Sequence, residues 1–326
     1  MVVVFHHFAI QVPPFDNGVL NQWIGNGNFM VNLFFVLSGF VLFHRYQNKD
    51  FITLNDFTSF YLKRAKRLLP LYFVGLLISL VYYVYITPSV DVPRIILAFT
   101  GVQAFDIWSF PVINVPSWSL SVEFFLYLLF PVVFMKLKNK SKSIVGFVAI
   151  AMWMLTEVGY NFLHLKYPLL HIDFIPLFSL ASFVIGMAAY KFLEQMVLLK
   201  PSSRKLLAIV VVSVVIVVLY LPYFYKNYSG ILAPLFGLLI VSLSAMPKSK
   251  HPTFWLDKLG DLSYPIYILH WPIYEIYGLT LEYVGIPDRH TYPIFLSYVS
   301  LVLLGSFVAH FVQKKAMKKI EKSTFV

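Results

Sequence analysis

Residues 115–131 read VPSWSLSVEFFLYLLFP. From Trp118 to Phe130 most side chains are apolar, as in a helix inside a membrane, yet Glu123 stands in the middle of the stretch. A carboxylate in the hydrocarbon core of a bilayer costs roughly 3 kcal/mol on insertion scales. We therefore expect Glu123 to face other protein or water, because lipid would leave its oxygens without hydrogen bonds.

The composition of the whole chain indicates the same environment. The sequence has 326 residues, of which 59% are hydrophobic and 13% are charged. A soluble domain of this composition would expose a large apolar surface to water, so we expect an integral membrane protein. The chain has no cysteine, which excludes a disulfide framework, a thiolate nucleophile and a cysteine metal site. No H-E-x-x-H or similar ligand spacing occurs, so no metal is predicted.

Apolar stretches close to the length of a membrane-crossing helix, which is about 20 residues, recur along the chain. The first is shorter than the others, and we expect it to be a truncated helix. The sequence therefore predicts an all-α, polytopic transmembrane bundle of about ten helices, formed by a single domain over residues 1–326. The predicted spans are 1–12, 29–44, 69–86, 118–135, 143–160, 174–191, 206–222, 230–246, 262–280 and 292–312.

The positive charge is distributed unevenly between these spans. The formal net charge is +11, which by itself would be compatible with nucleic-acid binding. However, 22 of the 26 lysines and arginines lie in alternate loops, at 45–68, 136–142, 191–205, 247–258 and after 313. This is the positive-inside pattern of a membrane protein, and it predicts that both termini are cytoplasmic. We therefore expect a lipid bilayer, and no nucleic acid, as the partner of these charges.

Two adjacent histidines lie in the first apolar stretch, VVVFHHFAI at 2–10. On a helix, the His6 and His7 side chains point about 100° apart, so at most one of them faces a given cavity. An imidazole takes up a proton near neutral pH, which suits it for general-base catalysis. The alternative is a packing histidine that is hydrogen-bonded to a neighbouring carbonyl.

Glu123 shares a helix face with other polar side chains. Ser119, Glu123 and Tyr127 are spaced i, i+4 and i+8, with Trp118 at the rim of that face. The carboxylate could orient a catalytic histidine, bind a hydroxyl group or relay protons. The alternative is a structural hydrogen bond between helices.

Two further stretches carry candidate site residues. In FYLKRAKRLLPLYF, at 60–73, Arg64 and Arg67 are spaced i and i+3 and could form one phosphate-binding fork. They could also be ordinary topology-setting charges or contacts to lipid headgroups. In LGDLSYPIYILHWPIY, at 259–274, Tyr264 and Tyr267 share a helix face, and His270, a second imidazole near the middle of a span, extends it by three residues.

Taken together, four blocks in this order resemble the acyltransferase 3 family of multi-pass membrane acyltransferases. They are VVVFHH, NFMVNLFFVLSGF with FYLKRAKRLLPLY, VPSWSLSVEFFLYLLFP, and LGDLSYPIYILHWPI. The resemblance implies transfer of an acyl group, usually acetyl from acetyl-CoA, to a hydroxyl of a carbohydrate, often one of the bacterial cell envelope. It also implies a bacterial cytoplasmic (inner) membrane protein with acyl-CoA as the donor and no metal.

The resemblance also assigns roles to individual residues. His6 matches the family's first-helix histidine and His7 is next in line, while Glu123 matches the glutamate of its W-S-L-x-x-E block. Arg64 and Arg67 match its R-x-x-R pair, at the donor end of the site. We therefore predict that His6, His7 and Glu123 are catalytic and that the two arginines bind the donor. The residues predicted to line the cavity are Ser119, Tyr127, Trp118, Tyr264 and His270.

The sequence departs from the family pattern in two ways. The family has an arginine upstream of the histidine, at a position that would precede Met1, and Asn32 stands where it has an aspartate. Some relatives carry a C-terminal extracytoplasmic hydrolase-like domain. This sequence ends with KKAMKKIEKSTFV, so we expect no such domain, and any equivalent would be a separate partner protein.

Two other functions are compatible with these residues. A secondary transporter or flippase for a small or lipid-linked substrate would also carry buried carboxylates and histidines, although the sequence has no visible inverted repeat. A structural membrane protein without activity is the other alternative. For an acyltransferase, direct attack of the hydroxyl on the thioester and a covalent acyl-histidine intermediate both stay open.

Overall fold

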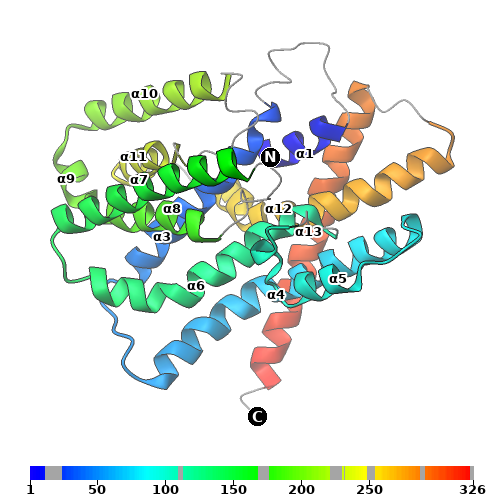
Figure 1. The fold of residues 1–326 in the computed structure, drawn as a ribbon, viewed down its shortest axis with the longest axis horizontal. Helices are drawn as coiled ribbons and strands as arrows, with labels where there is room; N and C mark the ends of the chain where they lie inside the picture. Colours follow the sequence, from blue (N-terminus) through cyan, green and yellow to red (C-terminus); the bar gives the residue numbers. More distant parts are fainter. Residues whose placement is uncertain are drawn as a thin grey trace.

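The computed structural model describes residues 1–11, 24–108, 113–167, 176–220, 230, 232–247, 254–286 and 291–323. Within these ranges the regular structure is entirely helical, and no strand occurs, which confirms the all-α class (Figure 1). The main helices are α1 (Val2–Gln11), α3 (Met30–Tyr46), α4 (Leu54–Ile86), α5 (Val92–Phe99), α6 (Trp118–Leu137), α7 (Lys142–Lys166), α8 (Pro176–Lys191), α9 (Leu193–Leu198), α10 (Pro201–Tyr220), α11 (Leu232–Ser244), α12 (Phe254–Tyr283) and α13 (Tyr292–Ser323).

Several of these helices have the length and composition of membrane spans. Within the described ranges five stretches qualify: Leu54–Ile86, Val115–Leu137, Lys142–Lys166, Pro201–Val218 and Tyr292–Met317. The helices α3, α8 and α11 are apolar but shorter. The protein therefore has multi-pass membrane character, while the number of crossings and the side of each terminus stay predictions.

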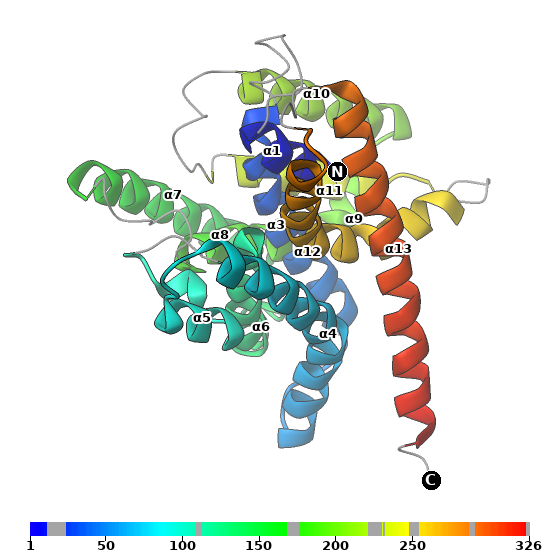
Figure 2. The same ribbon diagram turned by 90° about the vertical axis from the view of Figure 1, so that its right-hand side faces the viewer.

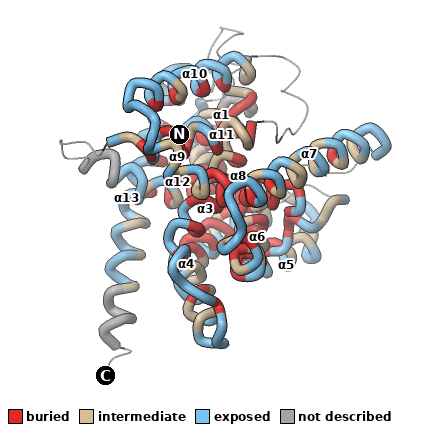
Figure 3. Tube along the Cα trace, turned by 90° about the vertical axis from the view of Figure 1, so that its left-hand side faces the viewer, coloured by how far each residue is buried: buried red, intermediate tan, exposed pale blue. Residues whose placement is uncertain are grey.

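The tightest helix packing lies between α3 and α8. At their crossing, a Cβ atom added to Gly39 would overlap the carbonyl oxygen of Phe183, and one added to Gly186 would overlap that of Val36. Only glycine allows the two backbones to approach so closely. Buried residues gather around this crossing and the neighbouring α6, whereas few residues of α7 and of the described part of α13 are buried (Figure 3).

Helix α4 begins well before the apolar span that predicts it. The Thr53 hydroxyl accepts a hydrogen bond from the Asp56 N–H, and the Asp56 carboxylate accepts one from the Thr53 N–H at 2.8 Å. This capping box starts the helix at Leu54. The helix then continues through the basic segment, because lysine and arginine are good helix formers, although lipid would exclude their charges. Consequently Arg64 and Arg67 lie inside α4 rather than at its start.

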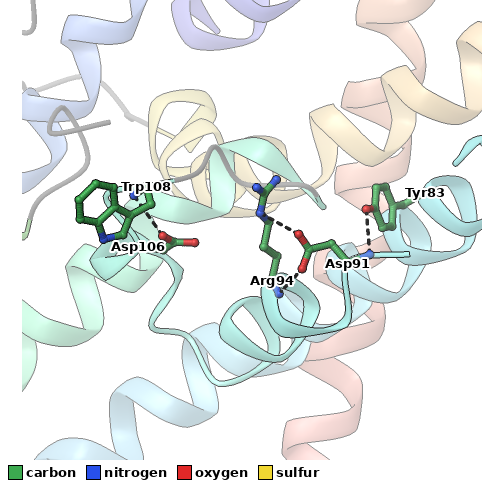
Figure 4. A network of polar contacts seen from close by, with 5 residues as sticks. All are labelled: Tyr83, Asp91, Arg94, Asp106 and Trp108. Carbon is green, nitrogen blue, oxygen red and sulfur yellow. Dashed lines mark hydrogen bonds and ion pairs between the residues drawn. The ribbon is translucent and has the colours of Figure 1, made fainter. Parts of the chain in front are cut away.

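The segment that follows α4 is tied back to that helix by polar contacts (Figure 4). Asp91 caps α5, accepting a hydrogen bond from the Arg94 N–H at 3.2 Å and an ion pair from the Arg94 Nε at 3.0 Å. The Asp91 N–H donates to the Tyr83 hydroxyl at 3.3 Å. Further along, the Trp108 N–H donates to the Asp106 carboxylate at 3.1 Å. The segment therefore has a defined structure next to the end of α4.

Three of the basic segments meet at one end of the bundle. Lys138, after α6, pairs with Asp50, which precedes α4, and donates to the Lys49 carbonyl at 3.1 Å. Lys191, at the end of α8, donates to the Lys140 carbonyl at 3.2 Å. The charge pattern groups these same segments on one side of the membrane, and which side that is stays a prediction.

Helix α12 is the centre of the region that carries the candidate site. It packs against α1, α4 and α13, so that elements far apart in the chain meet (Figures 1 and 2). Helix α13 also reaches α4, where the Gln313 side chain donates to the Arg67 carbonyl at 2.9 Å.

Candidate active site

The packing of α1 on α12 brings three histidines together. His7 Nδ1 lies 2.8 Å from His270 Nε2, and their rings are stacked with centroids 5.0 Å apart. The His6 ring centroid lies 5.1 Å from that of His7. His6 and His270 are buried, whereas His7 is only partly buried. Of these three histidines, His7 is therefore the least buried residue.

Hydrogen bonds determine which nitrogen of His7 carries the proton. His270 Nδ1 lies 2.5 Å from the Tyr267 carbonyl oxygen, which can only accept, so Nδ1 of His270 is the donor. A neutral His270 then accepts a hydrogen bond at Nε2, and the His7 Nδ1–H donates it. Nε2 of His7 is left with a free lone pair, which is the form that a general base needs.

His6 has a different partner. Its Nδ1 lies 2.9 Å from the Ile24 carbonyl oxygen, so this nitrogen is the donor and Nε2 carries the lone pair. The side chain is 6% exposed, which leaves little of the ring accessible. His6 therefore has the right tautomer for a base but less access than His7.

A second set of polar side chains lines a cavity of about 160 Å³ between α3, α4, α6 and α12. We call it the Glu123 cavity, because Glu123 lines it together with Ser38, Arg67 and Tyr264. The Tyr127 hydroxyl donates to Oε1 of Glu123, and the Ser38 hydroxyl lies 3.5 Å from the same oxygen. Arg67 lines the same cavity, and its positive charge favours a negative charge on Glu123. The carboxylate therefore faces a cavity that contains other polar side chains.

Tyr267 connects the three histidines to the Glu123 cavity. Its hydroxyl lies 2.7 Å from the Ser119 hydroxyl and 2.9 Å from the Pro116 carbonyl oxygen, and its side chain lines the Glu123 cavity. Its backbone carbonyl is the acceptor that orients His270. Tyr267 was not among the residues predicted to line the cavity, although its position one turn before His270 is the signal for this role.

The structure separates the two predicted donor-binding arginines. Arg67 lines the Glu123 cavity, whereas Arg64 lines another cavity, of about 580 Å³, between α4, α5 and α6. Arg64 donates to the Tyr46 hydroxyl at 2.8 Å, and its guanidinium group lies 4.1 Å from the Phe60 ring centroid. The two arginines therefore do not form the single fork that their spacing predicts.

The remaining predicted positions are divided between the site and its surroundings. Tyr127 lines the same cavity as Arg64 while it donates to Glu123, so it lies between the two cavities. Trp118 packs against the hydrophobic core and is not among the described residues that line the Glu123 cavity. Asn32 is buried and accepts a hydrogen bond from the Ser182 hydroxyl at 3.4 Å.

One buried carboxylate was missed by the sequence prediction. Glu275 on α12 is 7% exposed and accepts hydrogen bonds from the Ser79 hydroxyl at 2.5 Å and from the Trp271 indole N–H at 2.8 Å. The Trp271 ring in turn lies edge-on to His7, with centroids 5.4 Å apart. The signal was the same as for Glu123, a carboxylate within an apolar helix.

Among the described residues, no group of three or more histidine or acidic side chains could hold a metal ion, the three neighbouring histidines included. The site thus consists of an imidazole pair with a defined lone pair, next to a small cavity that holds a carboxylate and a guanidinium group.

Comparison with known proteins identifies the family. The profile of the acyltransferase domain matches residues 1–311. The chain belongs to the acyltransferase 3 family. It is 24% identical over 302 residues to peptidoglycan O-acetyltransferase OatA of Listeria monocytogenes, a match that covers 80% of this chain and 47% of that protein. It is also 33% identical over 114 residues to acyltransferase MdmB of Streptomyces mycarofaciens, which covers 32% of this chain and 28% of that protein.

Both matches cover less than half of the relative's own length. No solved structure gave a significant match. In this acyltransferase family member, the three neighbouring histidines and the Glu123 cavity are the two candidate parts of the catalytic site.

Proposed function

We propose that the protein is a membrane O-acyltransferase that moves an acyl group, in the simplest case acetyl, from acyl-CoA to a hydroxyl of a carbohydrate of the bacterial cell envelope. Membership of the acyltransferase 3 family and the similarity to a peptidoglycan O-acetyltransferase support it. The observation that carries the proposal is the His7–His270 pair, since it leaves a lone pair on Nε2 of His7, the least buried of the three histidines.

His7 is the general base of the proposed reaction. Its Nε2 takes the proton of the acceptor hydroxyl while the hydroxyl oxygen attacks the carbonyl carbon of the thioester. The bond from that carbon to sulfur then breaks, and the proton passes from His7 to the leaving sulfur, which gives an ester and a free thiol. His270 and the Tyr267 carbonyl hold the ring of His7 in the required tautomer throughout. His6 is the second candidate for the same role.

The Glu123 cavity binds polar parts of the substrates in this proposal. Arg67 attracts the negatively charged donor, and Glu123 accepts a hydrogen bond from a substrate hydroxyl or amide group. Ser119, through Tyr267, connects this cavity to His270. Glu123 has no direct contact with a histidine among the described residues, so we assign it to substrate binding rather than to orientation of the base.

The proposed setting is the cytoplasmic membrane, with the donor supplied from the cytoplasm and the acceptor on the outer side. The single domain of residues 1–326 would carry out the transfer.

The proposal is tested with purified protein, radiolabelled acetyl-CoA and soluble muropeptides as the acceptor. We expect a labelled ester on the acceptor, and a loss of about 100-fold to 10,000-fold in kcat for His7→Gln, as for other general bases. His270→Gln should also lower kcat, because it removes the group that orients His7. His44→Gln is the matched control, since His44 lies at the exposed end of α3 and bonds to Tyr190.

The outcomes separate the candidates. A fully active His7→Gln together with an inactive His6→Gln would move the base to His6. A protein that neither transfers nor hydrolyses the acyl group, but exchanges substrate across vesicles without acyl-CoA, would be a transporter, and the proposal would be wrong.

A further inference from the structure

A second polar cavity, of about 500 Å³, lies between α4, α12 and α13. We call it the α13 cavity, after the long C-terminal helix that runs beside α12 in Figure 2. Its polar lining residues are Arg67, Asp261, Tyr264, His310, Gln313 and Lys314. None of the residues that α13 contributes was predicted as part of the site.

The α13 cavity adjoins the Glu123 cavity. Arg67 and Tyr264 line both of them, so these two side chains form the boundary between the larger cavity and the smaller one. The Tyr264 hydroxyl donates to the Leu68 carbonyl at 2.5 Å, which holds the tyrosine against α4. A long molecule in the α13 cavity would therefore have to pass Arg67 and Tyr264 to reach Glu123.

Helix α13 presents one polar face to this cavity. His310, Gln313, Lys314 and Met317 are spaced i, i+3, i+4 and i+7, which places them along one side of a helix. The hydrogen bond from Gln313 to the Arg67 carbonyl, at 2.9 Å, fixes this face next to α4. Basic side chains from α4 and α13 thus line the same cavity.

The charges of the α13 cavity fit a phosphorylated ligand. Arg67 and Lys314 are cationic, His310 can donate a hydrogen bond in either protonation state, and Asp261 is the acidic residue among the lining side chains. Cationic and donor groups of this kind bind phosphate oxygens through charge-assisted hydrogen bonds. Asp261 opposes the binding of an anion, and its removal should therefore strengthen it.

We propose that the α13 cavity binds the phosphate groups of the acyl donor, with Lys314, His310 and Arg67 as their ligands, and that the thioester arm passes Tyr264 into the Glu123 cavity. This inference rests on the proposed function, because it names the binding site for the donor of that reaction. It separates Arg67, which contacts the donor, from Arg64, which is held by Tyr46 and Phe60 in another cavity. His310 and Lys314 are thus new binding residues.

The test compares two donors that differ in phosphate. The full chain in detergent is assayed with acetyl-CoA and with S-acetylpantetheine, which has the thioester arm but no phosphate. Lys314→Gln and His310→Gln should each raise the KM for acetyl-CoA about tenfold, the loss expected for one hydrogen bond between charged groups. They should leave kcat and the KM for S-acetylpantetheine unchanged. Lys315→Gln, on a neighbouring exposed residue outside the cavity, is the matched control.

Direct binding makes the test independent of turnover. Titration calorimetry with CoA should show about a tenfold weaker Kd for Lys314→Gln. For Asp261→Asn, the same titration should show a lower Kd for CoA, because a negative charge is removed from the cavity. Each measurement is repeated in nanodiscs of phosphatidylcholine alone and with phosphatidylglycerol, because a lipid headgroup offers the same phosphate chemistry.

The results distinguish this inference from the function on which it rests. Acetyl transfer with unchanged KM and Kd in both variants would overturn the α13 cavity as the donor site and leave the proposed function standing. Binding of CoA that depends on Lys314, without any acyl transfer, would support the cavity and overturn the proposed function. Displacement of CoA by phosphatidylglycerol, with no CoA binding in phosphatidylcholine, would make this a lipid site and overturn the inference.

Discussion

Glu123 and Glu275 lie in similar apolar stretches of α6 and α12, but their surroundings differ. Glu123 is only partly buried and lines a cavity, and among the described residues its two hydrogen bonds both end on Oε1. Glu275 is 7% exposed, and each of its oxygens accepts a hydrogen bond, one from Ser79 and one from Trp271. Oε2 of Glu123 is therefore available to a ligand, whereas Glu275 has its acceptors occupied by the protein.

This difference shows that a carboxylate in an apolar helix can serve two purposes. At Glu275 it joins α12 to α4 through Ser79, so its main effect is on the stability of the helix packing. At Glu123 the second oxygen and the nearby guanidinium group of Arg67 face open space, so its main effect should be on substrate. The following predictions test whether the two residues differ in this way.

The largest expected effect concerns turnover. Glu123→Gln should lower kcat/KM for acetyl transfer by about tenfold to a hundredfold, the range for loss of a hydrogen bond to a charged group. Glu275→Gln should stay close to the wild-type rate, because the amide oxygen can still accept from Trp271. The measurement is the initial rate with labelled acetyl-CoA. Equal losses in the two variants would contradict the division between substrate binding and helix packing.

The next largest effect concerns stability, and here the order is reversed. Glu275→Leu leaves the Ser79 hydroxyl and the Trp271 indole N–H without their acceptor, at a cost of about 1–3 kcal/mol for each group that stays buried and unpaired. Glu123→Leu should cost less, since Tyr127 and Ser38 can turn towards the cavity. Thermal unfolding in detergent measures both.

A double-mutant cycle makes this second comparison sharper. Ser79→Ala in the Glu275→Leu background should recover part of the lost stability, because it removes one of the unpaired donors. An additive result would mean that the contact between Ser79 and Glu275 does not stabilise the fold.

The smallest effect is expected at a carboxylate in water. Backbone and side-chain hydrogen bonds from Thr53, with a smaller contribution from the Ile52 N–H, hold the pKa of the exposed Asp56 carboxyl below its usual value of 3.8. Because the folded value is the lower one, this stabilisation is complete above pH 3.8 and is lost as the pH falls through the folded pKa.

The corresponding experiment follows the thermal midpoint against pH. Asp56→Asn should be slightly less stable than the wild type at neutral pH, and the difference should shrink below pH 3.8. A difference that stays constant down to the lowest pH would show that the capping box of α4 does not depend on the charge of Asp56.

Most helix positions could be predicted from apolar stretches, because lipid and core both select apolar side chains. The prediction of 118–135 is close to the observed α6, Trp118–Leu137. The predicted span 69–86 does not include the start of α4, because this helix begins at Leu54 and runs through a basic segment. Hydropathy reports where lipid is tolerated, whereas a helix begins where its first N–H groups find acceptors, here Thr53 and Asp56.

The sequence by itself determined the membrane class, the acyltransferase 3 family and the set of polar residues placed in apolar helices. These properties depend on composition and on motifs that are local in the chain. The tertiary structure decided which of those residues meet. His7 and His270 pair across the chain, Arg64 and Arg67 line different cavities, and Glu123 faces a cavity while Glu275 does not. The physical reason is that a hydrogen bond depends on the distance and direction between two atoms, which only the packing of distant helices sets.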